Sequence, residues 1–123
     1  MAGSTVYVDL NHAQWGSGTT VKVTVITSTR ALVFYGAVAV LVDNAGDLLE
    51  LSYRVTGATT IAASTAWATR DESGSASDES SAGRAHYVAN LTAGSNTFHL
   101  QALISNGSAT GIIRRPYLTV IAL

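Results

Sequence analysis

The sequence predicts an all-β fold, an antiparallel two-sheet jelly-roll sandwich of about eight strands. In several segments apolar residues recur at every second position, and no segment sustains the 3.6-residue period of a helix. Turn-forming residues interrupt these segments roughly every 8–12 residues, which is typical of sandwiches and barrels. The 123 residues, with a mass of 12.7 kDa, are expected to form one domain, residues 1–123.

The first half of the chain supplies the clearest strand patterns. Strands are expected at residues 5–10, 20–27, 31–42 and 48–56, with short candidates at 59–63 and 66–69. In residues 20–27, Val21, Val23 and Val25 alternate with polar residues, so one face should be buried. Trp67 is expected to anchor either the core or an interface.

Residues 31–42, ALVFYGAVAVLV, are apolar on both faces of the predicted strand. Antiparallel strands normally leave one face polar, so a second cover is expected. One cover is the domain core, and the other is predicted to be a neighbouring subunit. The predicted subunit contact uses this strand and the C-terminal one, through Val38, Val40, Val42, Ile113, Val120, Ile121 and Leu123.

Residues 70–84, RDESGSASDESSAGR, form the one low-complexity stretch and are predicted to be an exposed acidic loop. They contain no apolar side chain larger than alanine. Their carboxylates could in principle hold Ca²⁺, through Asp71, Glu72, Asp78 and Glu79. The spacing fits no calcium-binding loop, so a solvated loop is the preferred interpretation and no metal is predicted.

The last third predicts three more strands, at residues 85–91, 96–105 and 111–123. A tight Asn106-Gly107 turn would suit a hairpin. Pro116 cannot donate a backbone hydrogen bond, which places it at a sheet edge or a bulge.

The charge composition restricts the possible partners. Charged residues are 12% of the chain, against about 25% in ordinary globular domains, and six of the fifteen lie within residues 70–84. We interpret this as a surface partly covered by a partner, although abundant serine and threonine could also solvate it. With one lysine, Lys22, and a net charge of −1, the chain is not expected to bind nucleic acid.

No membrane or export signal is apparent. The first residues lack the basic and apolar regions of a signal peptide, and the apolar run of residues 31–42 is too short for a membrane-spanning helix. The chain has no cysteine, which rules out disulfides and thiolate ligands.

No pattern of catalytic residues emerges. His12, His86 and His99 have no second histidine at metal-ligand spacing, and no nucleophile-elbow motif is present. Gly16-Ser17-Gly18 lacks the spacing of a phosphate-binding loop. The prediction is therefore a non-enzyme without catalytic, cofactor-binding or metal residues.

Two patterns could concern glycans. Asn90 and Asn106 begin glycosylation acceptor patterns, which are frequent by chance. Trp15, beside glycine, could stack on a sugar, but a core tryptophan is the preferred interpretation.

Residues 91–102, LTAGSNTFHLQA, resemble a segment of compact jelly-roll domains from bacterial and phage proteins. Those domains are similar to the trimeric heads of the complement and tumour-necrosis-factor type. The match includes a turn of leucine, a small residue and glycine before a Thr-Phe-x-Leu-Gln strand at 97–101, and a short apolar final strand at 118–123. Residues 53–60, YRVTGATT, also resemble a mid-domain segment of the family, and the first twenty residues do not.

This resemblance implies a jelly roll, a homotrimer about a threefold axis and no enzymatic activity. In phages such domains occur on tails and as capsid-decorating proteins. Because the domain has its own Met1 and no stalk, we expect a free-standing decoration protein on the virion, cementing the major capsid protein at the capsid surface. The alternative is a receptor- or glycan-binding head of a phage tail or bacterial surface protein.

Overall fold

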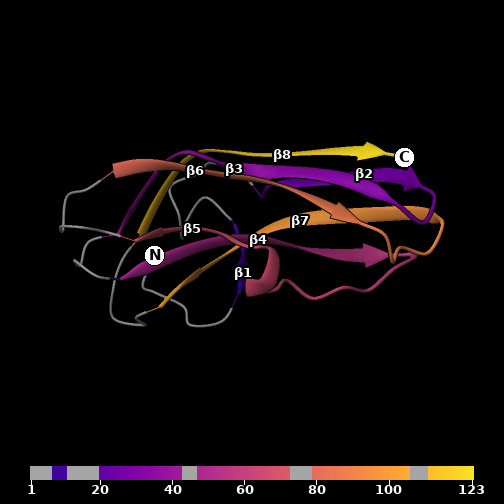
Figure 1. The fold of residues 1–123 in the computed structure, drawn as a ribbon, viewed down its shortest axis with the longest axis horizontal. Helices are drawn as coiled ribbons and strands as arrows, with labels where there is room; N and C mark the ends of the chain where they lie inside the picture. The colour runs from indigo at the N-terminus through magenta and orange to yellow at the C-terminus, as the bar shows by residue number, and fades with distance from the viewer. Residues whose placement is uncertain (1–6, 11–19, 43–46, 73–78, 106–110) are drawn as a thin grey trace.

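Eight β-strands make up most of the described chain in this computed structural model (Figure 1). The structure describes residues 7–10, 20–42, 47–72, 79–105 and 111–123, without the side chains at positions 39, 41, 42, 72 and 79. The strands are β1 Val8–Asp9, β2 Lys22–Thr27, β3 Ala31–Val42, β4 Leu48–Gly57, β5 Thr69–Glu72, β6 Glu79–Val88, β7 Gly94–Ile104 and β8 Gly111–Ala122.

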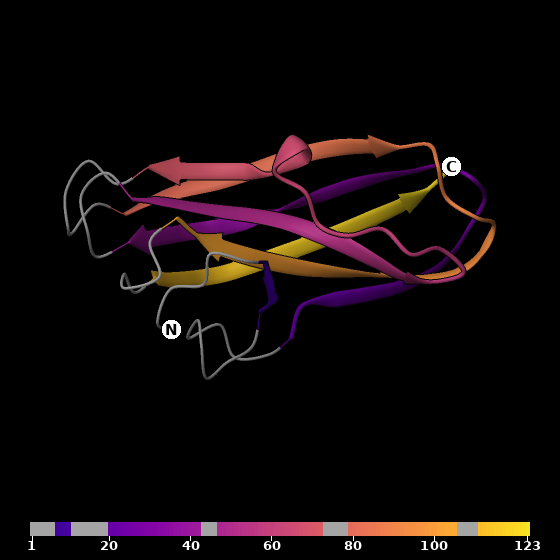
Figure 2. The ribbon, with the colours of Figure 1, turned by 90° about the horizontal axis from the view of Figure 1, so that it is seen from below.

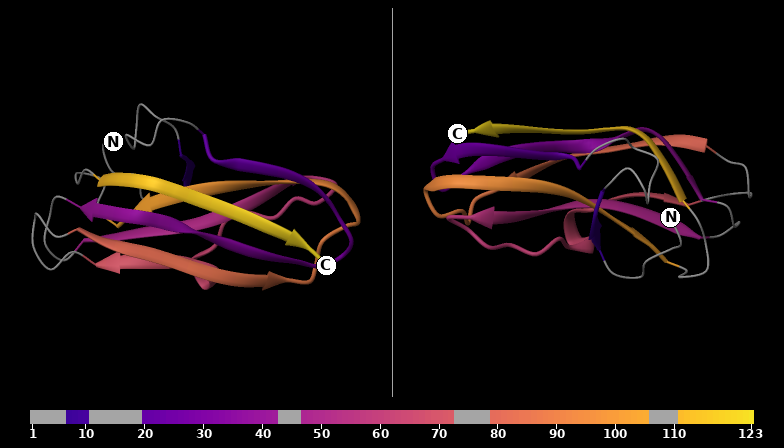
Figure 3. Two further views of the ribbon diagram at one scale, coloured as in Figure 1. Left: turned by 90° about the horizontal axis from the view of Figure 1, so that it is seen from above. Right: turned by 180° about the vertical axis from the view of Figure 1, so that it is seen from behind.

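The strands form two antiparallel sheets that face one another as two layers, seen one above the other in Figure 1 and in the right view of Figure 3, and one behind the other in Figure 2. The larger sheet has the order β1-β7-β4-β5, and β2 also pairs with β7, beside β1. The smaller sheet has the order β6-β3-β8. Successive strands from β2 onward cross between the sheets, except for the β4–β5 hairpin. This connectivity is that of a jelly roll, which confirms the predicted fold class.

The segment between β4 and β5 differs from the prediction of two short strands at 59–63 and 66–69. Ile61 makes an isolated bridge to Val55, with backbone N···O distances of 2.9 and 3.0 Å, and residues 59–63 form no strand. A 3₁₀ helix, η1 Thr65–Trp67, comes next, because the Ser64 side chain accepts a hydrogen bond from the Ala66 backbone and caps it. Only Thr69, the last residue of the second candidate, lies in a strand.

The prediction of a loop over residues 70–84 was wrong at both of its ends. Residues up to Glu72 belong to β5, which pairs with β4, and residues from Glu79 onward belong to β6, which pairs with β3. Backbone ladders satisfy N–H and C=O groups whatever the side chains are, so a segment poor in apolar residues can still form a strand. Residues 73–78 lie outside the described part.

The core fills the space between the inner faces of the two sheets. Tyr35 from β3 and Tyr53 from β4 meet edge to face, with ring centroids 5.2 Å apart, and Phe98 of β7 lies 5.9 Å from Tyr53. The largest fully buried side chains are Tyr35, Tyr53, Phe98, Leu10, Leu49, Leu51, Leu100, Ile104, Ile113, Val33 and Val40.

A buried asparagine joins the chain segments at one end of the sandwich. Asn96 is fully buried, and its Nδ2 donates to Thr27 Oγ1 at 2.8 Å and to the Thr92 carbonyl at 3.0 Å. Its Oδ1 accepts from the Thr59 backbone at 2.9 Å. One side chain thus satisfies polar groups from three separate segments.

Pro116 lies on β8, which pairs only with β3 among the described strands, as expected for an edge position. The preceding residue, Arg115, has a φ of 50°, the only positive value among the described non-glycine residues. On β3, which pairs with this part of β8, the register with β6 shifts between Ala37 and Val40. The two irregularities bend β3 and β8 at the same level.

Candidate interaction surface

The outer face of the β6-β3-β8 sheet carries apolar and aromatic side chains that nothing in the described chain covers. In the strand registers, Leu32 of β3 lies between Tyr87 of β6 and Ile121 of β8, and Phe34 lies between an alanine and a threonine. Exposure reaches 55% for Val38, 50% for Tyr87 and 46% for Ile121. We call this surface the apolar face, and it consists of Leu32, Phe34, Val38, Tyr87, Tyr117, Ile121 and Leu123.

Tyr117 lies across the middle of the apolar face, over two glycines. Gly36 of β3 is opposite Gly83 of β6 and opposite Tyr117 of β8. A Cβ atom at Gly36 would lie 2.7 Å from the Tyr117 hydroxyl oxygen, and one at Gly83 would overlap the same oxygen. The glycine pair therefore leaves the space that lets the tyrosine ring reach from β8 to β6.

The predicted subunit-contact residues divide between the two sides of the sheet. Val38, Ile121 and Leu123 lie on the apolar face and are 46–55% exposed. Val40 and Ile113 point into the sandwich and are fully buried, so their side chains serve the core of the protein itself.

Val120 is half-buried against that core, and the side chain of Val42 lies outside the described residues. The sequence pattern missed Tyr87 and Tyr117. The alternation around Tyr117 and Ile121 could have indicated the β8 residues, but Tyr87 is recognisable only once β6 is paired with β3.

One histidine belongs to an aromatic cluster between the sheets. His86 of β6 stacks on Trp67 of η1, with centroids 5.2 Å apart and an interplanar angle of 9°. Its Nδ1 lies 2.6 Å from the Tyr53 hydroxyl, and the Trp67 carbonyl accepts a hydrogen bond from Tyr35. Burial, and then the charge of Arg84, lower the pKa of His86, so the ring is neutral at pH 7.

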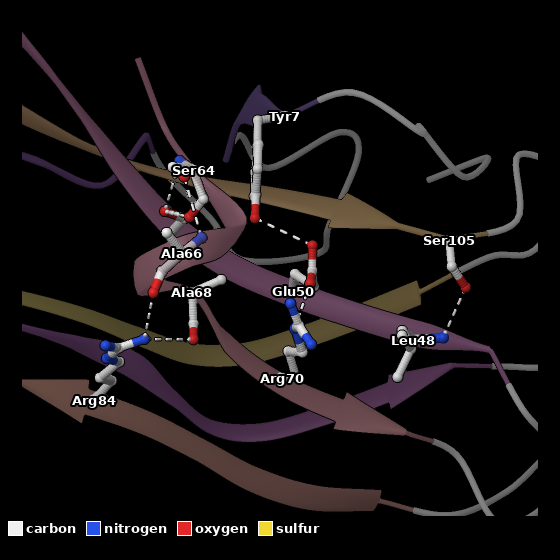
Figure 4. Close-up of polar contacts among 10 residues, drawn as sticks. Tyr7, Leu48, Glu50, Ser64, Ala66, Ala68, Arg70, Arg84 and Ser105 are labelled. Atoms are coloured by element: carbon white, nitrogen blue, oxygen red, sulfur yellow. Dashed lines mark hydrogen bonds and ion pairs between the residues drawn. The ribbon is translucent and has the colours of Figure 1, made fainter. Parts of the chain in front are cut away.

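Arg84 and Glu50 fasten the segment that closes this side of the sandwich (Figure 4). Arg84 Nη1 donates to the carbonyls of Ala66 and Ala68, each at 3.2 Å, and so ties β6 to η1. Glu50 is buried and ion-paired with Arg70 of β5 at 2.5 Å. It also accepts from the Tyr7 hydroxyl at 3.1 Å. These are structural ties between neighbouring segments.

The two described histidines lie on different sheets and have different neighbours. His86 faces the aromatic cluster, whereas His99 of β7 bonds Thr56 Oγ1 at 2.9 Å on the outer face of the larger sheet. His12, Trp15 and Asn106 lie outside the described residues, and Asn90 is exposed. Within the described ranges there is neither a pocket nor a group of three potential metal ligands, and no helix there is long and apolar enough to cross a membrane.

Comparison with known proteins supports the fold. No protein-family model and no curated protein matches the chain. Among solved structures, the Eiger TNF of S. frugiperda is similar, with 15% identity and a TM-score of 0.57, over 98% of this chain and 88% of that one. This likeness shows that the chain shares the all-β jelly-roll fold of that structure.

Two carbohydrate-binding modules are more distant. CBM6cm-2 of the Cellvibrio mixtus lichenase 5A, solved with cellotriose, has 17% identity and a TM-score of 0.39, over 98% of this chain and 73% of that one. CBM35 from Cellvibrio japonicus Abf62 has 16% identity and a TM-score of 0.41, over 99% and 91%.

Proposed function

We propose that the protein is a non-enzymatic structural protein of a phage virion, a homotrimer that decorates the capsid and cements neighbouring capsid subunits. The observation that carries this proposal is the apolar face. It exposes three aromatic or β-branched side chains, Val38, Tyr87 and Ile121, by about half of their surface. Leaving such surface in water forfeits about 25 cal/mol per Å².

The apolar face suits contact with further copies of the same chain. It places seven apolar or aromatic side chains on one sheet face, with the charged Arg114 towards one end of β8, and obligate interfaces are rich in apolar side chains in the same way. A closed ring of three copies would hide all three faces and leave no uncovered contact for further growth. The low charged fraction of 12% agrees with a surface that is partly covered.

The capsid location rests on the resemblance of residues 91–102 to phage and bacterial jelly-roll domains. It can be tested by immuno-electron microscopy of the source phage, with antibodies raised against the purified chain. Label distributed over the capsid would support decoration. Label confined to the tail, or absent from the particles, would contradict it.

A glycan- or receptor-binding head is the second candidate, and one observation favours it. Tyr87 and Tyr117 expose aromatic rings on the same sheet face, and sugars stack on such rings. If this candidate is correct, the apolar face stays open in solution and Tyr117→Ala abolishes binding on a glycan array. A trimer that buries Tyr117 would exclude this use of the face.

A further inference from the structure

The outer face of the larger sheet carries a row of basic side chains across three strands. His99 of β7 lies directly opposite Lys22 of β2 in one register and directly opposite Arg54 of β4 in the other. Neighbouring strands are about 4.8 Å apart, so the three residues leave the same face within about 10 Å. We call Lys22, His99 and Arg54 the basic row.

Threonine hydroxyls lie next to the basic row. Two residues along each strand, Thr24, Thr97 and Thr56 form a parallel row, with Thr97 opposite both of the others. Thr24 and Thr97 share a hydrogen bond of 2.8 Å, and Thr56 bonds the His99 ring at 2.9 Å. The hydroxyls add neutral hydrogen-bonding groups beside the charges.

Both acidic groups described on this face are already engaged, Glu50 with Arg70 and Asp9 with Arg54. Asp9 accepts from Arg54 Nε at 3.0 Å and Nη2 at 2.7 Å, and from Gln101 Nε2 at 2.8 Å. Lys22 is exposed and forms no ion pair with a carboxylate of the described residues. The row therefore keeps more donors and positive charge than its own acceptors can satisfy.

Lys22 and Arg54 both lie directly opposite His99, so protonation of the His99 ring would place like charges opposite one another, which a bound anion would offset. Burial lowers the pKa of His99 first, and the charge of Arg54 lowers it further. A carboxylate placed over the row would offset that repulsion and raise the pKa of His99.

We propose that the basic row docks a carboxylate-rich segment of a partner protein. The inference rests on the proposed function, because a trimer formed through the apolar face leaves this opposite sheet facing outward. A protein segment fits better than a sugar, because the described residues form no pocket and the exposed tyrosines lie on the other sheet. Nucleic acid would need a larger cluster of lysine and arginine.

The test is a nuclear magnetic resonance titration of the full chain with hexaglutamate at low salt. We expect the His99 ring signals to shift, with a dissociation constant of about 1 mM that rises as salt is added. The pKa of His99 should rise in the complex. Lys22→Gln should weaken binding about fivefold, whereas Arg30→Gln, which removes an exposed charge outside the row, should not.

Three results would overturn the proposal: unchanged His99 signals, equal weakening by both substitutions, or tighter binding of a sulfated oligosaccharide of the same charge. The outcome is independent of the oligomeric state. A monomer that binds hexaglutamate through the row would contradict the proposed trimer alone, and a trimer that does not bind it would contradict this inference alone.

Discussion

Single polar side chains, buried at Asn96 and half-buried at His86, hold together parts of this fold that are far apart in the sequence. Asn96 connects segments near Thr27, Thr59 and Thr92, and His86 connects β6 with β4 and η1. Such groups are expensive to leave without partners, so they are sensitive positions. Neither role could be predicted from the local sequence, because the partners Thr59 of Asn96 and Tyr53 of His86 lie more than 30 residues away along the chain.

Asn96→Ala should lower the free energy of unfolding by about 2–4 kcal/mol, because it leaves the buried Thr59 N–H without its acceptor and removes the hydrogen bonds to Thr27 and to the Thr92 carbonyl. Urea denaturation followed by circular dichroism measures this difference. Asn90→Ala, at an exposed position, is the matched control and should stay within about 0.5 kcal/mol of the wild type. Equal stability of the two variants would contradict the role assigned to Asn96.

The two described histidines should make the protein less stable in mild acid. Burial lowers the folded-state pKa of His86 and of His99 below the unfolded value of 6.5. The unfolded chain therefore binds more protons, and stability falls as the pH drops through about 6.5 towards the folded pKa values. The groups that face His86 are Tyr53, Trp67 and Arg84, and none of them is a carboxylate.

Urea denaturation at pH 7.5 and at pH 5 measures this loss. Asp9, whose pKa is lowered mainly by its hydrogen bond with Arg54, contributes its own change only below about pH 4. In the His86→Gln variant, the free energy of unfolding should differ less between pH 7.5 and pH 5 than it does in the wild type. A difference as large as that of the wild type would contradict the part assigned to His86.

At the scale of strands, the apolar face depends on how Tyr117 crosses the sheet. A Cβ at Gly83 meets mainly the Tyr117 side chain, whereas one at Gly36 also overlaps the backbone carbonyl of Ala82. Removing the Tyr117 ring clears the space beside Gly83, but the Ala82 carbonyl beside Gly36 stays in place. The two glycines therefore differ in a way that a double-mutant cycle can detect.

Gly83→Ala should destabilise the wild type but cost little in a Tyr117→Ala background. Gly36→Ala should destabilise both backgrounds, because backbone atoms must move. Thermal unfolding of the six proteins provides the comparison. If Tyr117→Ala rescues both glycine substitutions equally, the packing described for Gly36 is incorrect.

Element by element, the sequence predicted strands well where apolar alternation is strong. The predicted strand at 31–42 coincides with β3, and the one at 48–56 is β4 without its last residue. The strand predicted at 59–63 and both ends of the loop predicted over 70–84 were wrong, because pairing with segments distant in the chain determines the structure there. The sheet face to which the Val40 and Ile113 side chains point likewise depends on irregularities in β3 and β8, which the local sequence pattern does not predict.

At the scale of the whole molecule, the two sheets present outer faces of opposite character. The smaller sheet exposes the apolar face, whereas the larger sheet exposes threonines, the basic row and one large apolar side chain, Ile26. A charge placed on the apolar face should therefore disrupt association without unfolding the chain, and the same charge in the core should unfold it.

Val38→Asp and Val40→Asp compare a charge on the apolar face with a charge in the core, at two positions of the same strand. Val38 is exposed and Val40 is fully buried. We expect Val38→Asp to give a folded monomer with the strand-rich circular dichroism of the wild type, and Val40→Asp to lose that signal. Thr24→Asp, on the exposed opposite sheet, should change neither property. If the Val38→Asp protein associates like the wild type, Val38 is not part of the subunit contact.

Self-association through the apolar face is the central claim, and analytical ultracentrifugation of the wild-type chain tests it most directly. Sedimentation equilibrium at micromolar concentration should give a mass three times the chain mass of 12.7 kDa. Ile121→Asp, which places a charge on the same face, should reduce that mass to a single chain. A wild type that sediments as a well-behaved monomer of 12.7 kDa would contradict the claim.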